Sequence, residues 1–288
     1  MKIVKILGGL GNQMFQYALY LSLKETFPQE NVTVDLSCFH GYHLHNGFEI
    51  ARIFSLHPDK ATVMEILRIA YYYPNYFFWQ IGKRVLPQRK TMCTESTKLL
   101  FDKSVLEREG DRYFDGYWQD ERYFIDCRRT ILNTFKFPPF TDDNNLALLK
   151  KMDTNSVSIH VRRGDYVGNK LYQGICDLNY YREAIMKISS YISPSMFCVF
   201  SNDIEWCRDN LESFIKAPIY YVDWNSGTES YRDMQLMSCC GHNIIANSSF
   251  SWWGAWLNQN SSKIVIAPKR WINLKNCGFM LPSRWVKI

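Results

Sequence analysis

Two adjacent arginines, Arg162 and Arg163, follow a short apolar segment that ends at Val161. A guanidinium group matches a phosphate through two parallel hydrogen bonds, so a buried strand that ends in arginines and a glycine is typical of an anion site. Because strand residues alternate between faces, we expect Arg162 to share a face with His160 and Arg163 to point the other way. Gly164 is expected to let the chain turn sharply. An exposed strand end with solvated arginines is the alternative.

Polar residues follow other apolar segments of the C-terminal half. Asp203 follows one such segment, and Ser248 and Ser249 follow another. Short apolar segments alternate here with segments of helical spacing, which predicts a parallel, doubly wound sheet. Ligands of such sheets bind beyond the carboxyl ends of the strands. We therefore expect Arg162, Asp203 and the two serines to meet at one edge of the sheet.

Each of these residues suits part of a nucleotide. An arginine can neutralise a diphosphate, and the Asp203 carboxylate can accept hydrogen bonds from the N1–H and N2–H₂ groups of guanine. The hydroxyl and N–H groups of Ser248 and Ser249, at a helix start, can hold phosphate oxygens. Phe250 and the tryptophans after it can stack on a base or form core. The pattern nearest to Asp-x-Asp is Asp203-Ile-Glu205, so we expect no metal held by paired carboxylates.

The N-terminal half opens with an apolar segment, the glycine loop Gly8-Gly-Leu-Gly-Asn-Gln13, and then apolar residues at helical spacing. This order predicts the start of a Rossmann-like unit, in which Gly11 and Asn12 lie where backbone can approach a ligand. The loop is not G-x-G-x-x-G, so a dinucleotide site is not indicated. A tight strand-to-helix turn without a ligand explains the glycines equally well.

Prolines and polar residues near Pro138 mark a lobe boundary. We expect an N-terminal, acceptor-side lobe over residues 1–140 and a nucleotide-binding lobe over 141–270, with 271–288 assigned to neither. Within the first lobe, a strand is predicted over 112–118 and an amphipathic helix over 121–135.

An aromatic segment, Tyr71–Trp79, precedes Lys83, Arg84, Arg89 and Lys90. Aromatic residues beside cations are typical of a surface that rests on an anionic membrane. Packing of the same aromatic residues inside the lobe is the alternative.

The composition is that of an ordinary globular protein, with 288 residues, 47% hydrophobic and 22% charged. The net charge of +6 permits a basic cleft for a phosphorylated ligand but is too small and dispersed to indicate nucleic acid. Nine cysteines at scattered spacings argue against a disulfide framework. The apolar segment at the start of the chain is too short for a signal peptide. No apolar segment of the sequence is long enough to span a membrane. A cytoplasmic enzyme, or a trimmed catalytic domain, is expected.

The sequence resembles the α-1,2-fucosyltransferases, glycosyltransferase family 11. The resemblance spans nearly the whole chain and is carried by Gly8–Ala18, His160–Tyr166, Ser201–Asp203, Asp233–Ser238 and Asn247–Trp256. It implies an α/β GT-B fold, with two Rossmann-like lobes, parallel sheets and an interlobe cleft. It also implies metal-independent, inverting transfer of L-fucose from GDP-β-L-fucose to the 2-hydroxyl of a galactose residue, and no cofactor.

The resemblance implies roles for individual residues. Arg162 would hold the donor diphosphate, Asp203 would bind guanine, and His160 would lie near the ribose. Ser249 and Phe250 would lie near the phosphates, and Asn12 would face the donor from the first lobe.

Asp165 is the carboxylate nearest in sequence to Arg162 that can act as a general base. Pairing with an arginine, for which Arg163 is the candidate, or fixing the turn at Gly164 explains Asp165 at least as well. Residues 167–170 offer no glutamate, and the reaction can also proceed with little base assistance.

The expected acceptor is a galactose-terminated oligosaccharide or a lipid-linked glycan, which would place the enzyme at the inner face of the membrane. A transferase for another GDP-sugar and a noncatalytic glycan-binding module are the competing interpretations.

Overall fold

The computed structural model describes residues 1–275, 277 and 281–288. The chain forms two compact units, Met1–Pro138 and Pro139–Ile288. The boundary lies between two consecutive prolines, which restrict the backbone and cannot donate to a sheet or helix. The C-terminal segment from residue 271 lies in the second unit, although residues 276 and 278–280 of that segment are outside the described ones.

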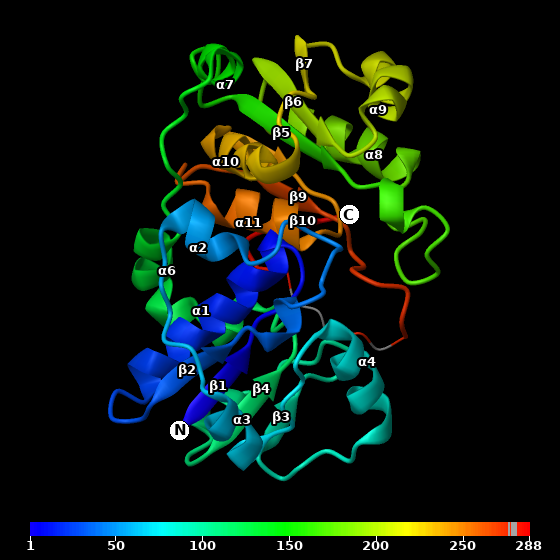
Figure 1. Cartoon of the computed structure of the whole chain (residues 1–288). Coiled ribbons are helices and arrows are strands. Elements are labelled where there is room, and N and C mark those ends of the chain that lie inside the picture. Colours follow the sequence, from blue (N-terminus) through cyan, green and yellow to red (C-terminus); the bar gives the residue numbers. More distant parts are fainter. Residues whose placement is uncertain (276, 278–280) are drawn as a thin grey trace. The chain divides into compact units, whose positions relative to one another are not determined.

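The first unit is an α/β layer around a parallel sheet with the strand order β2-β1-β4-β3 (Figure 1). Its elements are β1 (Lys2–Lys5), α1 (Leu10–Thr26), β2 (Val32–Asp35), α2 (Glu49–Phe54), α3 (Val63–Ile69), α4 (Tyr76–Val85), β3 (Met92–Thr94), α5 (Ser104–Glu107), β4 (Arg112–Asp115) and α6 (Arg128–Thr134). Ile3 of β1 and Tyr113 of β4 pack against Ile66 and Ile69 of α3.

Two predictions for this unit are wrong. The strand predicted over 112–118 ends at Asp115, because the carboxylate of Glu95 accepts hydrogen bonds from the backbone N–H groups of Tyr117 (2.7 Å) and Trp118 (3.0 Å) and turns the chain. The helix predicted over 121–135 is confined to α6 and is preceded by two 3₁₀ turns, Glu121–Tyr123 and Ile125–Cys127. Phe124 between these turns has a non-helical backbone (φ −149°, ψ 9°), which breaks the helical phase.

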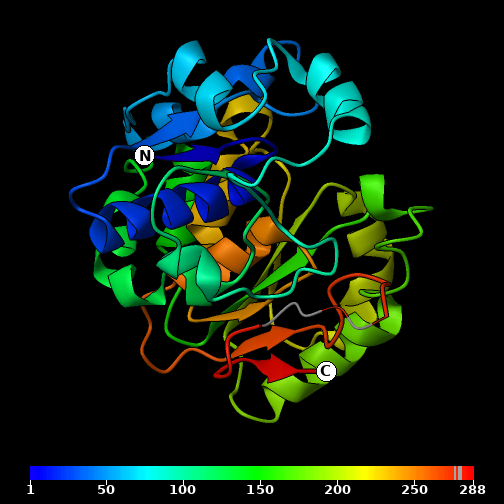
Figure 2. The ribbon, with the colours of Figure 1, turned by 90° about the horizontal axis from the view of Figure 1, so that it is seen from below.

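The second unit is built on a parallel sheet with the strand order β10-β9-β8-β5-β6-β7, so the predicted parallel sheet is confirmed. Figure 2 shows β10 beside β9 at one edge of this sheet. The elements are α7 (Asp143–Leu149), β5 (Ser156–Val161), α8 (Leu178–Ser189), β6 (Met196–Ser201), α9 (Ile204–Leu211), β7 (Ile219–Val222), α10 (Tyr231–Cys239), β8 (His242–Ile244), α11 (Ser249–Leu257), β9 (Val265–Ala267) and β10 (Val286–Lys287).

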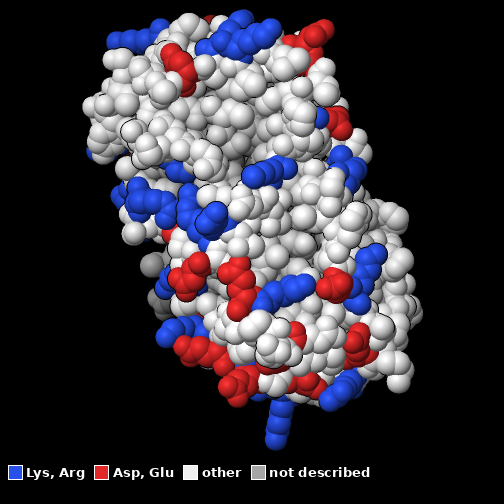
Figure 3. All heavy atoms as spheres, turned by 90° about the vertical axis from the view of Figure 1, so that its left-hand side faces the viewer, with Lys and Arg blue, Asp and Glu red and all other residues white. Residues whose placement is uncertain are grey.

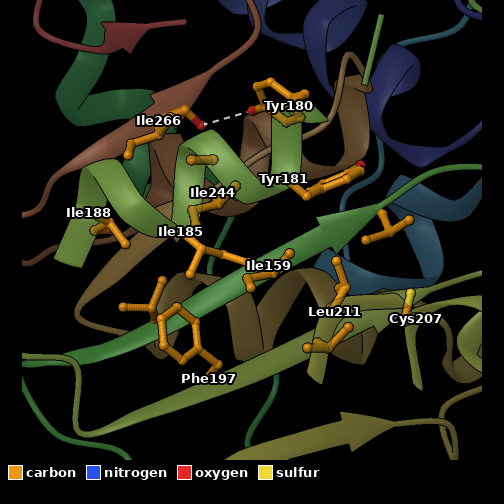
Figure 4. Packing of buried hydrophobic residues seen from close by; sticks show 14 residues of the cluster. Ile159, Tyr180, Tyr181, Ile185, Ile188, Phe197, Cys207, Leu211, Ile244 and Ile266 are labelled. Atoms are coloured by element: carbon orange, nitrogen blue, oxygen red, sulfur yellow. Dashed lines mark hydrogen bonds between the residues drawn. The ribbon is translucent and has the colours of Figure 1, made fainter. Parts of the chain in front are cut away.

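Alternation along the central strands sorts the core of this unit into two layers. Ile159 of β5 and Phe197 of β6 pack against Ile185 of α8 on one face of the sheet, as Figure 4 shows. Cys198 of β6 packs against Leu236 of α10 on the other face. Burial on both faces explains why these strands read as continuous apolar segments.

Candidate functional site

The strand order of the second unit reverses at β5, because the chain runs from β5 through β6 to β7 and then returns to β8 on the other side of β5. Such a switch point is where open parallel sheets bind ligands. Arg162 follows the last residue of β5, Asp203 follows β6, and Ser248 follows β8. The structure thus places these residues at the carboxyl ends of three neighbouring strands.

A cavity of about 220 Å³ lies at this edge. Its lining includes both arginines, Asn247 and the stacked rings of Tyr166 and Tyr172, whose centroids are 4.5 Å apart. The prediction that Arg162 and Arg163 point to opposite faces requires the strand to extend to them. The strand ends at Val161, before either arginine, so the alternation of strand faces no longer applies.

Each arginine pairs with a different carboxylate. The Nη2 atom of Arg162 lies 2.7 Å from Oδ1 of Asp165, and Nε of Arg163 lies 2.9 Å from Oδ2 of Asp203. The guanidinium of Arg163 also covers the ring of Trp206, 4.3 Å from its centroid. The predicted pairing of Arg163 with Asp165 is therefore wrong, because a 3₁₀ turn from Gly164 brings Asp165 back to Arg162 instead.

Gly164 is needed for space. A Cβ atom at this position would lie 2.1 Å from Nδ2 of Asn202, whose Oδ1 accepts a hydrogen bond from the backbone N–H of Arg163 (3.0 Å). The chain turns at Gly164, as predicted, although the φ angle of this glycine is outside the left-handed region. Close approach of Asn202 fixes the backbone that carries the two arginines.

Asp203 keeps capacity for further hydrogen bonds. Its Oδ1 atom accepts from the backbone N–H of Trp206 (3.3 Å) and caps α9, while Oδ2 accepts from Arg163. Each carboxylate oxygen has two lone pairs, so one acceptor site remains on each. About 37% of the side chain is exposed, so Asp203 is accessible to a ligand.

His160 lies beneath this edge, buried on β5, with its ring centroid 5.9 Å from that of Phe250. Burial, together with the nearby charge of Arg162, lowers the pKa of His160 to about 3. The ring is therefore neutral at physiological pH. Its Nδ1 atom is buried without a hydrogen-bond partner in the structure, and such atoms are uncommon in folded proteins.

The two serines differ in role. The Oγ atom of Ser248 accepts a hydrogen bond from the backbone N–H of Phe250 (3.3 Å), which makes Ser248 the N-cap of α11. Ser249 is the first residue of the helix and is half-buried. The hydroxyl of Ser248 is thus used within the protein, and Ser249 is the better placed of the two for an anion.

The glycine loop belongs to the first unit. Gly11 and Asn12 lie in the first turn of α1, and Oδ1 of Asn12 accepts a hydrogen bond from Nε2 of Gln119 (2.7 Å). Gly8 has a φ of 101°, a conformation that favours glycine. The N-cap residue Gly9 provides no side-chain cap, but the backbone N–H of Leu10 donates to the carboxylate of Glu49, and that of Asn12 donates to the carbonyl oxygen of Gly9 (2.9 Å).

Sequence reasoning missed several residues that line the cavity or orient one of its arginines. Asn202 and Trp206 orient Arg163, and Tyr166 donates a hydrogen bond from its hydroxyl to the carbonyl oxygen of Asn247 (3.1 Å). Tyr166 and Asn202 each stand within one of the motifs quoted above, which was the available signal. The stacking of Tyr172 on Tyr166 had none.

Other kinds of site have little support. Within the described part of the chain, no group of three or more His, Cys, Asp and Glu side chains is arranged to hold a metal ion. A search of the same residues finds no helix with the length and apolarity to cross a bilayer. Among the described residues visible in Figure 3, cations and anions are interspersed, without the continuous basic surface that nucleic-acid binding requires.

Comparisons with known proteins agree with this geometry. The chain is 35% identical to an alpha-1,2-colitosyltransferase of Escherichia coli, over 99% of this chain and 98% of that protein. It is 32% identical to the O-antigen biosynthesis glycosyltransferase WbnK of Escherichia coli, over 98% of each. The mouse galactoside alpha-(1,2)-fucosyltransferase 2 is 28% identical over 50% of this chain and 44% of its own length.

The fold is also known. The crystal structure of fucosyltransferase NodZ from Bradyrhizobium matches 88% of this chain and 91% of that chain with a TM-score of 0.52 and 15% identity. Two Rossmann-like units with parallel sheets make the GT-B fold that the sequence predicts. The model of Glycosyl transferase family 11 matches residues 1–280. The chain belongs to this family of glycosyltransferases.

Proposed function

We propose that the protein transfers L-fucose from GDP-β-L-fucose to the 2-hydroxyl of a galactose residue in a glycan, with inversion and without a metal. The proposal is supported by relatives named as alpha-1,2-colitosyltransferase and galactoside alpha-(1,2)-fucosyltransferase. The observation that carries it is the position of Arg162, which lines a cavity at the carboxyl end of β5.

Arg162 can stabilise the negative charge of the leaving group. When the bond to fucose breaks, the sugar becomes cationic at its anomeric carbon and the oxygen of GDP gains negative charge. A fixed guanidinium beside that oxygen stabilises the charge as it develops, which lowers the barrier without reorganisation of solvent. Asp165 occupies one edge of this guanidinium.

The same pair suggests how the acceptor is activated. A donor diphosphate would compete with Asp165 for Arg162 and release a carboxylate that is already 60% exposed. Asp165 would then be free to accept the proton of the attacking hydroxyl. The hydroxyl adds to the face opposite the departing GDP, so a β-linked donor gives an α-linked product.

The test is a transfer assay with the purified protein, GDP-β-L-fucose and a panel of galactose-terminated oligosaccharides, with EDTA present. Mass spectrometry measures the added deoxyhexose, and NMR of the product assigns the linkage. An α-1,2-linked fucosyl galactoside is expected. Release of GDP without a glycosylated product, a β-linked product or transfer to a hydroxyl other than O2 would each reject the corresponding part of the proposal.

One observation supports a different sugar nucleotide as the donor. The 35% identical relative is named for colitose, which is L-fucose without the 3-hydroxyl. Competition between GDP-fucose and its 3-deoxy counterpart in the same assay decides between them, because a site that binds the 3-hydroxyl strongly rejects a sugar that lacks it. A noncatalytic glycan-binding module would instead be stabilised in thermal unfolding by oligosaccharides alone and not by GDP.

A further inference from the structure

The outward face of α4 carries exposed apolar side chains. Phe77, Phe78, Ile81 and Val85 project from one side of the helix, and Phe77 is 63% and Val85 73% exposed. A surface helix of a globular protein normally presents charged residues to solvent. Figure 1 shows α4 at the periphery of the first unit. The outward apolar side of α4 therefore needs an explanation.

The inward side of the same segment is packed. Tyr73 is buried, and Trp79 stacks on Tyr76 and lies 3.8 Å from the amino group of Lys5. Packing inside the lobe, the alternative for the Tyr71–Trp79 aromatic segment, is thus confirmed for only some of its residues. Tyr73 and Trp79 are part of the lobe, while Phe77 and Phe78 are on its surface.

Helix α3 has the same arrangement. Ile66 and Ile69 face the sheet, whereas Val63, Met64 and Leu67 are exposed. The Nη1 atom of Arg89, which follows α4, donates a hydrogen bond to the carbonyl oxygen of Leu67 (2.8 Å), so the chain after α4 contacts α3. We call the exposed apolar residues of these helices the α3–α4 face; they are Val63, Met64, Leu67, Phe77, Phe78, Ile81, Val85 and Leu86.

The charges on and after α4 have one sign, whereas α3 carries Glu65 between Met64 and Leu67 of this face. The sequence from Ile66 to Thr94 contains no Asp or Glu, and its cations are Arg68, Lys83, Arg84, Arg89 and Lys90. Three of them have contacts within the unit: Arg68 with Asp111, Lys83 with the Trp79 ring and Arg89 with Tyr71. Arg84 and Lys90 are exposed. An apolar face flanked by exposed cations complements a surface that is apolar inside and anionic outside.

We propose that the α3–α4 face binds the surface of an anionic lipid bilayer. Its aromatic and aliphatic side chains enter the boundary between headgroups and acyl chains, and Arg84 and Lys90 lie near lipid phosphates. A second copy of this chain fits less well, because a symmetric contact through α4 would bring together two helices that carry Lys83 and Arg84 and no Asp or Glu. The proposal does not depend on the donor or the acceptor.

The test is flotation of the full chain with vesicles of phosphatidylcholine, with or without about one third phosphatidylglycerol. The protein is expected to float with the anionic vesicles at low salt, less at high salt, and less with the neutral vesicles, since screening weakens the attraction. Phe77→Ser/Phe78→Ser/Val85→Ser is expected to lower the partition coefficient at least about tenfold, because it removes the inserted apolar area.

Matched variants separate this face from the rest of the surface. Met186→Ser/Tyr191→Ser removes exposed apolar side chains from the second unit and is expected to bind as the unaltered protein does. Arg84→Gln/Lys90→Gln should lower binding to anionic vesicles by about fivefold per charge, whereas Arg182→Gln/Lys187→Gln, with the same change in net charge, should not.

Failure of the unaltered protein to float with either vesicle would overturn the proposal, as would equal losses in the matched variants of the second unit. Sedimentation that shows a dimer abolished by the triple serine variant would assign the face to a second copy. Because flotation uses no donor, its failure is independent of any failure in the transfer assay.

Discussion

The Nε atom of Arg163 lies 2.9 Å from Oδ2 of Asp203, so the residues that follow the adjacent strands β5 and β6 hold each other in place. The neighbouring arginine has a different partner, with Arg162 bound to Asp165. The two arginines therefore differ in the carboxylate that each one binds. Arg163 orients a carboxylate, and the carboxylate partner of Arg162 lies only three residues away on a 3₁₀ turn.

Arg162→Lys is expected to lower kcat by about a hundredfold or more, with a smaller rise in the KM for the donor. An ammonium group lacks the planar fork that binds two oxygens at once, and a contact that strengthens in the transition state is lost mainly from kcat. Steady-state kinetics with GDP-fucose measures both constants. Arg208→Lys, which alters an exposed pair with Asp223 in the same unit, is the control and should stay within about twofold. A folded Arg162→Lys enzyme with nearly normal kcat would remove the arginine from the mechanism.

Arg163→Lys is expected to act mainly on donor binding. Lysine can still reach Asp203, but it loses the stacking on Trp206 and leaves the carboxylate less constrained. We expect the donor KM to rise by about tenfold, since a hydrogen bond to a charged group is worth roughly 1.5–3 kcal/mol, while kcat changes little. The same kinetic experiment tests this. A larger loss of kcat than in Arg162→Lys would mean that Arg163 is the arginine on the leaving group.

Asp203→Asn is expected to weaken GDP binding by roughly 1–3 kcal/mol, because one acceptor oxygen is replaced by a donor amide facing the N–H groups of guanine. Asparagine is also a good N-cap, so α9 should remain folded. Calorimetry with GDP and with inosine diphosphate, which lacks the 2-amino group, measures base recognition directly. The unaltered protein should prefer GDP, and Asp203→Asn should reduce that preference. An unchanged ratio of the two affinities would show that Asp203 does not contact the base.

His160 is expected to make the fold less stable in acid. Its pKa is lowered to about 3 in the folded state by burial, so below the ordinary value of 6.5 the unfolded chain binds a proton that the folded chain excludes. The stability contributed by neutral His160 is complete above about pH 6.5 and is lost as the pH falls toward 3, with a slope of about 1.4 kcal/mol per pH unit.

Urea unfolding of the protein and of His160→Gln at several pH values between 6.5 and 4 measures this loss. The variant is expected to show a shallower decline, although its stability at neutral pH is lower because the ring packs against Phe250. Parallel declines in the two proteins would show that His160 is protonated in the folded state or accessible to water.

The sequence by itself determined the alternation of strands and helices and the ends at which chemistry can occur. Apolar segments such as Val157–Val161 must be buried on both faces, and parallel strands bring the residues that follow them to one edge. That reasoning placed Arg162, Asp203 and Ser248 correctly at the ends of neighbouring strands, because it depends only on local hydrophobicity and on the rules of parallel sheets. It also identified the family, through motifs that extend along most of the chain.

Only the tertiary structure decided which side chains pair. Whether Asp165 binds Arg162 or Arg163 depends on where β5 ends and on the turn that follows, and neither is encoded by periodicity. The position of Asn202 against Gly164 likewise comes from a neighbouring strand 38 residues along the chain (202 − 164). The sequence contained the aromatic residues near α4, but the three-dimensional packing of the helix against Lys5 decided that Trp79 is inside the lobe and Phe77 outside it. Contacts between residues distant in sequence are set by the geometry of packing, which no local pattern contains.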